Sequence, residues 1–205
     1  MQCSPGRELS LQEVCKLAMV RPDRVPGGVP IALEATQSYE PPPLSTPNAT
    51  HLAIVEVDPQ TGQTQILKYI VVHDCGKMIN PMIVEGQIRG GTAQGIGNAL
   101  YEDLVYNEDG QLLTGSLMDY TIPTAMETPP IEIAHLETPS PKTMGGVKGM
   151  GEGGAIAPPG ALANAVADAL SPFGVKVTQL PITPERLWRQ IQQAKKREKG
   201  AAAPP

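Results

Sequence analysis

A predicted helix that begins at Asn80-Pro81 constrains the fold more than any other feature, because one nine-residue run within it carries four glycines in helical register. Asparagine is a good helix cap and proline is tolerated in the first turn, so the pair indicates a helix from Pro81 to about Leu104. Within it, the run "RGGTAQGIG" places glycines at positions 90, 91, 95 and 97. Each glycine costs about 0.5–1 kcal/mol relative to alanine. We therefore expect another helix or a ligand to approach this helix closely.

One face of the same helix is rich in side-chain amides. Its members are spaced at i, i+4, i+7 and i+11 and are Gln87, Gly91, Gln94 and Asn98. Three amides around a glycine form a neutral hydrogen-bonding surface on which a heterocycle or a dinucleotide could lie. The alternative is an ordinary solvated helix face.

The other elements indicate an α+β fold. Two strands around the turn "DPQTG" predict a hairpin over 51–74, because the turn residues are flanked by β-rich runs. Hairpins and helices are mixed without regular βαβ alternation. We expect β-hairpins packed with the long glycine-containing helix and C-terminal helices. The further expected elements are helices over 10–20, 161–170 and from Pro184, strands over 32–40, 131–137 and 175–180, and a second hairpin over 104–115.

The predicted organisation is an N-terminal helical segment (1–25), a main lobe (26–192) and a disordered tail (193–205). Aromatic residues make up only 3% of the chain, so its core must be aliphatic. A small aliphatic core with 21 glycines and 22 prolines suggests that the chain relies on a partner.

Charge and cysteine content exclude several classes of protein. A net charge of −5 argues against a nucleic-acid-binding protein. Three cysteines without paired spacing indicate a reducing compartment. The sequence shows neither a signal peptide nor an apolar run of about 20 residues that could span a membrane. We expect a cytoplasmic protein.

A glycine-rich stretch, "GVKGMGEGGA" (146–155), holds the single carboxylate Glu152. It formally fits G-x-G-x-x-G, but a loop precedes it, prolines follow it and Glu152 would repel a pyrophosphate, so a nucleotide-binding Rossmann site is not expected. Glycines let the backbone approach a bound group, and a carboxylate held away from water can act as a base. The alternative is a flexible surface loop with an exposed glutamate.

The segment "HDCG" places His73 and Cys75 on the same face of a strand. Zinc needs three or four protein ligands, and His51 and His135 are isolated in the sequence. We expect a packed strand end and no metal ligands.

Three long motifs occur in a characteristic order: "VVHDCGKMINPMIVEGQIRGGTAQGIGNALYE", "DGQLLTGSLMDYTIPTA" and "GVKGMGEGGAIAPPGALANAVADAL". From about Pro26 to about Trp188, the chain resembles the C-terminal part of the large, molybdopterin-binding subunit of molybdenum hydroxylases. These are the xanthine dehydrogenase, aldehyde oxidase and aerobic carbon monoxide dehydrogenase-like enzymes.

The resemblance implies a role for individual residues. Glu152 matches the glutamate that acts as general base, deprotonating a molybdenum-bound hydroxide that attacks the substrate while hydride passes to the sulfido ligand. Gln87 matches a glutamine that hydrogen-bonds the pterin, and Gln94 lies on the same face. The remaining implied cofactor-binding positions are Gly91, Gly149 and Gly151.

The resemblance also implies missing parts, because such subunits are several times longer than this chain. We expect a molybdenum–molybdopterin cofactor, in its cytosine dinucleotide form, shared with the rest of the large subunit. Iron–sulfur clusters and FAD are expected on partner chains. The chain is interpreted as one polypeptide of a large subunit divided into two, or as a truncated product or partial sequence. The substrate class is an aldehyde, an N-heterocycle or a related compound, with water as the oxygen source. The alternative is a non-catalytic cofactor-binding or assembly module, or an inactive remnant.

Overall fold

The computed structural model describes residues 9–25, 27, 33–42 and 45–201, and the chain divides into two compact units, Met1–Pro41 and Pro42–Pro205. The first unit contains helix α1 (Leu11–Val20) and a 3-10 turn, η1 (Pro22–Arg24). Ser10 caps α1 in a capping box with Glu13, so the predicted N-terminal helix is confirmed. The strand expected over 32–40 is wrong for the described residues 33–40, which have an irregular backbone. Residue 32 lies outside the described residues.

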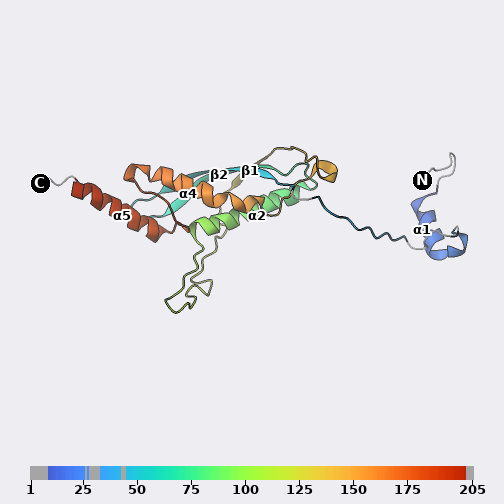
Figure 1. The fold of residues 1–205 in the computed structure, drawn as a ribbon, viewed down its shortest axis with the longest axis horizontal. Coiled ribbons are helices and arrows are strands. Elements are labelled where there is room, and N and C mark those ends of the chain that lie inside the picture. Colours follow the sequence, from blue (N-terminus) through green and yellow to red (C-terminus); the bar gives the residue numbers. More distant parts are fainter. Residues whose placement is uncertain (1–8, 26, 28–32, 43–44, 202–205) are drawn as a thin grey trace. The chain divides into compact units, whose positions relative to one another are not determined.

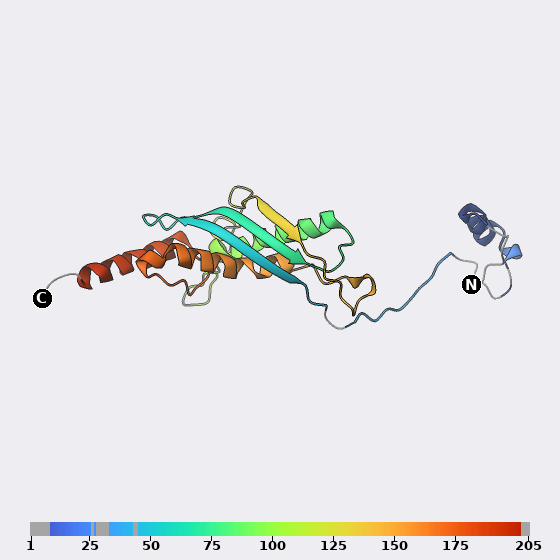
Figure 2. The ribbon, with the colours of Figure 1, turned by 90° about the horizontal axis from the view of Figure 1, so that it is seen from above.

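The second unit is built on a three-stranded sheet in the order β1-β2-β3 (Figure 2). Strands β1 (Asn48–Val57) and β2 (Thr64–Asp74) pair antiparallel, which confirms the predicted hairpin. Strand β3 (Ile131–His135) pairs parallel to β2, with Tyr69 opposite Ile131 and His73 opposite His135. The parallel pairing is possible because α2 (Pro81–Leu100) runs between β2 and β3 as the crossover helix.

Helices cover one face of this sheet (Figures 1 and 2). Helices α2 and α4 (Pro158–Ala169) lie beside each other, and the four-residue helix α3 (Gly153–Ile156) precedes α4. Helix α5 (Pro184–Ala201) adds Leu187 and Ile191 to the core. The core is largely aliphatic, as the scarcity of aromatic residues predicts, and its fully buried members include Tyr69, Val71, Ile88, Ile96, Leu162 and Val166.

Several predicted boundaries are wrong. Helix α2 ends at Leu100 because the Tyr101 and Glu102 amides both donate to the Gly97 carbonyl. The hairpin expected over 104–115 is reduced to one bridge, Tyr106–Leu112. The strand expected over 175–180 does not form, and none of the strands in the described part of the chain pairs with these residues.

Two further helix boundaries, the start of α4 and the end of α5, differ from the predictions. Helix α4 begins at Pro158, since proline fits a first helical turn. Helix α5 continues through residues 193–201, where a disordered tail was expected. Among the described residues, no helix combines the length and the apolar character that a membrane span requires.

Candidate functional site

The end of strand β2 anchors the glycine-rich loop. The carboxylate of Asp74 accepts hydrogen bonds from the Thr138 amide at 3.1 Å and the Gly76 amide at 2.8 Å. It also forms an ion pair with the Lys148 ammonium at 3.3 Å, with both side chains at least 90% buried. Thr138, then Gly76 and Lys148, hold the pKa of Asp74 well below its usual value. A charged Asp74 therefore ties the loop to the sheet.

Backbone contacts reinforce this anchor. The Lys148 amide donates to the Cys75 carbonyl at 2.8 Å, and Gly76 and Val147 form an isolated bridge. Gly76 has φ +66°, and a side chain there would collide with the Gly146 carbonyl oxygen. The "HDCG" segment thus holds the loop in place. Among the described residues, no group of three or more His, Cys, Asp and Glu side chains is arranged to hold a metal ion.

The glycines of α2 admit helix α3. A Cβ added at Gly91 would lie 2.9 Å from the Ala155 nitrogen, and one at Gly95 would lie 2.7 Å from the Pro158 ring. From the opposite side, a Cβ at Gly154 would lie 2.6 Å from the Ile88 carbonyl oxygen. The close approach predicted from the helical glycines is therefore confirmed at positions 91 and 95, where α3 and the first residue of α4 pack against α2. Gly90, in contrast, faces open space.

This packing forms a cavity of about 400 Å³ between α2 and the loop. Five of the six predicted site residues line it, namely Gln87, Gly91, Gln94, Gly151 and Glu152. The Gln87 side-chain amide donates to the Gly151 carbonyl oxygen at 3.2 Å and so links the two walls. The sixth residue, Gly149, lies elsewhere, where its amide donates to the Ser45 carbonyl at 3.2 Å.

Glu152 is exposed in this chain, although the sequence suggested a carboxylate held away from water. It is the only charged side chain among the described residues that line the cavity. The rest of the lining consists of two amides, glycine backbone and the apolar side chains of Ala155 and Ile156. Such a surface suits a planar heterocycle with hydrogen-bond donors and acceptors, whereas a phosphate beside Glu152 would be repelled. The residues present therefore fit the pterin part of a molybdopterin, on one side of it.

Three histidines gather beneath the loop, a cluster that sequence reasoning missed. His73 is fully buried, and within the described part of the chain neither of its ring nitrogens has a hydrogen-bond partner. It lies beside His135 on β3 and close to His51 on β1, and a Cβ at Gly153 would lie 2.5 Å from its Nε2. Burial, together with His135, lowers the pKa of His73. The alternation of the strands placed all three on the covered face, but only the pairing register brought them together.

Comparisons of the sequence with known proteins identify relatives of one kind. A family model described as a molybdopterin cofactor-binding domain matches residues 1–129. The nicotine 6-hydroxylase large subunit of Paenarthrobacter nicotinovorans is 48% identical over 181 residues, which are 88% of this chain and 22% of that protein. The carbon monoxide dehydrogenase large chain of Hydrogenophaga pseudoflava is 35% identical over 188 residues, 92% of this chain and 23% of that protein.

Solved structures agree with these relatives. Quinoline 2-oxidoreductase from Pseudomonas putida 86 superposes with a TM-score of 0.79 at 51% identity, over 86% of this chain and 22% of that chain. An aldehyde oxidoreductase from Desulfovibrio gigas gives a TM-score of 0.64 at 31% identity, over 71% of this chain and 15% of that chain. The chain thus spans less than a quarter of the length of these proteins.

Proposed function

The chain belongs to the molybdopterin cofactor-binding family of molybdenum hydroxylase large subunits, and we propose that it supplies one wall of the cofactor site together with the general base, Glu152. The predicted resemblance and the α+β fold are confirmed by these relatives. The observation that carries the proposal is the cavity that brings Glu152 onto the amide face of α2.

In this proposal, Gln87 and Gln94 hold the pterin through their side-chain amides. Gly90 keeps the helix surface flat, so that a planar ring can lie close to the backbone, and Gly91 lets α3 pack against the helix beside it. When bound, the molybdenum centre supplies the two-electron acceptor for hydroxylation with an oxygen atom from water. Gly149 contributes indirectly, since its hydrogen bond to Ser45 holds the start of the loop.

Glu152 accepts the proton that the attacking water-derived group must lose. Gln87 positions it through the bond to Gly151, the residue immediately before it. A base of this kind works best with a pKa near the operating pH, and burial raises the pKa of a carboxyl. Because Glu152 is exposed in this chain, we propose that another polypeptide covers it.

The proposed assembly follows from the small fraction of its relatives' length that the chain covers. The covering polypeptide is the rest of the molybdenum-binding subunit, and iron–sulfur and FAD subunits carry the electrons away. The cofactor is the cytosine dinucleotide form, and the setting is the cytoplasm, in keeping with the free thiols of Cys15 and Cys75. Two relatives, at 48% and 51% identity, are named for the N-heterocycles nicotine and quinoline, so an N-heterocycle is the proposed substrate.

The test is co-expression with the polypeptide that completes the subunit, followed by Glu152→Gln. We expect hydroxylation of N-heterocycles to fall by about 10²–10⁴-fold, the usual contribution of a general base. Molybdenum content, measured by mass spectrometry of the purified complex, is expected to stay unchanged because Gln87 and Gln94 remain.

A matched control is Glu137→Gln, which removes an exposed carboxylate outside the cavity and should leave the rate unchanged. Near wild-type activity of Glu152→Gln would show that the base is another residue. A wild-type complex that holds molybdenum but oxidises no aldehyde or N-heterocycle would instead favour a cofactor-binding module without catalysis.

A further inference from the structure

A long segment between α2 and β3, residues 102–129, extends away from the helices as a protrusion (Figure 1), and we refer to it as the arm. None of its residues is buried. It nevertheless carries eight of the large apolar side chains that the structure leaves exposed: Leu104, Val105, Tyr106, Leu113, Leu117, Met118, Ile122 and Met126. Met118 is 88% exposed and Leu117 is 73% exposed. Loops of this length without helices or strands are uncommon and usually functional.

The arm has a defined shape because it is held by its own hydrogen bonds. The Leu113 amide donates to the Val105 carbonyl at 2.8 Å, which closes the outer loop. At the root, the Tyr120 hydroxyl donates to the Glu102 carboxylate, and Asp103 forms an ion pair with Arg186 of α5 at 2.7 Å. The ion pair with Arg186 anchors the arm to the body, the other two bonds hold the arm's own shape, and none of them buries its apolar residues.

The charge of the arm has one sign. Its carboxylates are Glu102, Asp103, Glu108, Asp109, Asp119 and Glu127. No lysine or arginine occurs anywhere from residue 90 to residue 141. A surface that fits the arm must therefore combine apolar contacts with basic side chains.

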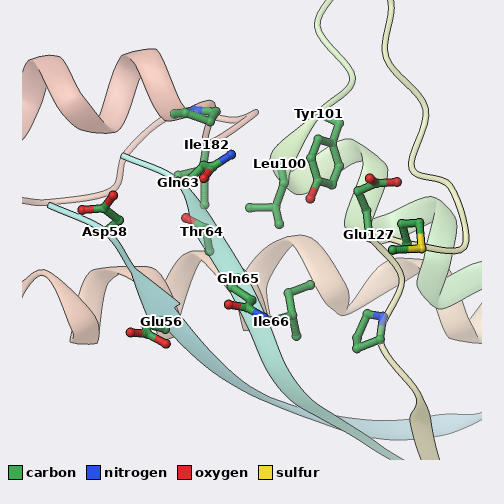
Figure 3. A pocket seen from close by; sticks show the side chains of 13 residues that line it. Glu56, Asp58, Gln63, Thr64, Gln65, Ile66, Leu100, Tyr101, Glu127 and Ile182 are labelled. Atoms are coloured by element: carbon green, nitrogen blue, oxygen red, sulfur yellow. The ribbon is translucent and has the colours of Figure 1, made fainter. Parts of the chain in front are cut away.

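A cavity of about 550 Å³ lies at the root of the arm (Figure 3). Glu56 and Asp58, at the end of β1, lie on one side of it, and Glu127 of the arm lies on the opposite side. The Gln60 amide and the Thr61 hydroxyl lower the pKa of Asp58, and bonds from Thr124 lower that of Glu127, so both are charged at neutral pH. Among the described residues that line the cavity, none is a lysine or an arginine.

We propose that the arm and this acid-lined cavity form one docking surface for a basic, partly apolar segment of the polypeptide that completes the molybdenum-binding subunit. The partner's apolar side chains cover Leu117 and Met118, and a lysine or arginine side chain enters the cavity between Glu56 and Glu127. This assignment rests on the proposed function, which requires such a polypeptide. A second copy of the chain is the poorer occupant, because it would bring one acidic arm against another.

The probe is the nicotine 6-hydroxylase large subunit of Paenarthrobacter nicotinovorans, shortened by the region that matches this chain. It is co-expressed with the full chain, and the affinity of the purified pair is measured by titration at low and at high salt. We expect a stable pair whose affinity falls as salt rises. Met118→Arg should weaken it at least tenfold, whereas Met118→Leu keeps the affinity. Glu56→Lys should weaken it by a similar factor and Glu56→Gln by less.

Met118 and Glu56 are exposed, so the variants should keep the wild-type circular dichroism spectrum. Equal affinity of Met118→Arg and Met118→Leu, or no pair with the wild-type chain, overturns the docking surface. Sedimentation of the chain alone tests whether a second copy of the chain occupies the surface. A dimer that Met118→Arg dissociates would also overturn the proposed docking surface for the partner polypeptide. The binding measurement requires no cofactor and is therefore independent of activity. If the complex is inactive but the arm variants still weaken binding, the proposed function is refuted and the docking surface is supported.

Discussion

Replacing Gly91 with alanine tests whether the packing of α3 on α2 forms the candidate site. The added Cβ would lie 2.9 Å from the Ala155 nitrogen and 3.0 Å from two atoms of Gly154, about 0.4–0.5 Å inside ordinary contact. All three are backbone atoms, so no flexible side chain can move aside. Overpacking of this kind costs about 1–3 kcal/mol, and alanine recovers about 0.5–1 kcal/mol of helix propensity. The expected net loss is about 0.5–2 kcal/mol.

Gly86→Ala is the matched control in the same helix. A Cβ there meets nothing within 4 Å, so only the helix-propensity gain of about 0.5–1 kcal/mol remains. Urea unfolding followed by circular dichroism measures both variants, which should differ by about 1–3 kcal/mol in opposite directions. If Gly91→Ala proves as stable as Gly86→Ala, α3 does not lie against α2 and the cavity between them is not built as described.

Three further outcomes are expected. Gly90→Ala should be as stable as the wild-type chain or more stable. The complex should nevertheless hold less molybdenum, because the Cβ of Ala at position 90 enters the cavity. Unchanged molybdenum content would place the cofactor elsewhere. Lys148→Met should leave Asp74 buried without its ion pair and destabilise the chain by about 1–3 kcal/mol, with faster proteolysis of the glycine-rich loop; unchanged proteolysis would contradict the anchor. Burial, with His73 nearby, lowers the pKa of His51 to about 4. The contribution of neutral His51 to the free energy of unfolding should therefore be fully present above about pH 6.5 and fall by about 1–2 kcal/mol by pH 5, which the urea midpoint measures. His51→Asn should make this dependence shallower, with His73, whose pKa is also lowered, supplying the remainder; an equally steep dependence would exclude His51 as a source.

Elements with strong local signals were predicted well. The capping box at Ser10, the turn between β1 and β2, and the helix starts at Pro81 and Pro184 each depend on a few adjacent residues. Strands over 32–40 and 175–180 were predicted from short local stretches of sequence, which do not supply a pairing partner. A strand is stable only when a neighbour satisfies its hydrogen bonds, and that neighbour is decided by the tertiary fold.

Most of the candidate site followed from sequence, but its supports did not. Gln87, Gly91 and Gln94 share a face because helical periodicity is a local property of the backbone. The Asp74–Lys148 ion pair joins residues far apart in the chain, and the histidine cluster depends on strand register. The hydrogen bond from the Gly149 amide to Ser45 is another support that no local pattern could indicate, and the place of Gly149 at the cofactor stays a prediction.

The sequence by itself determined the amide face of α2, the single carboxylate of the glycine-rich loop and the family whose motifs contain both. Only the tertiary structure decided that these features line one cavity. More than fifty residues separate Gln94 from Glu152, and their proximity requires α3 to fit against the helical glycines while Asp74 holds the loop. Such contacts depend on the shape of the packed backbone, which no single stretch of sequence encodes.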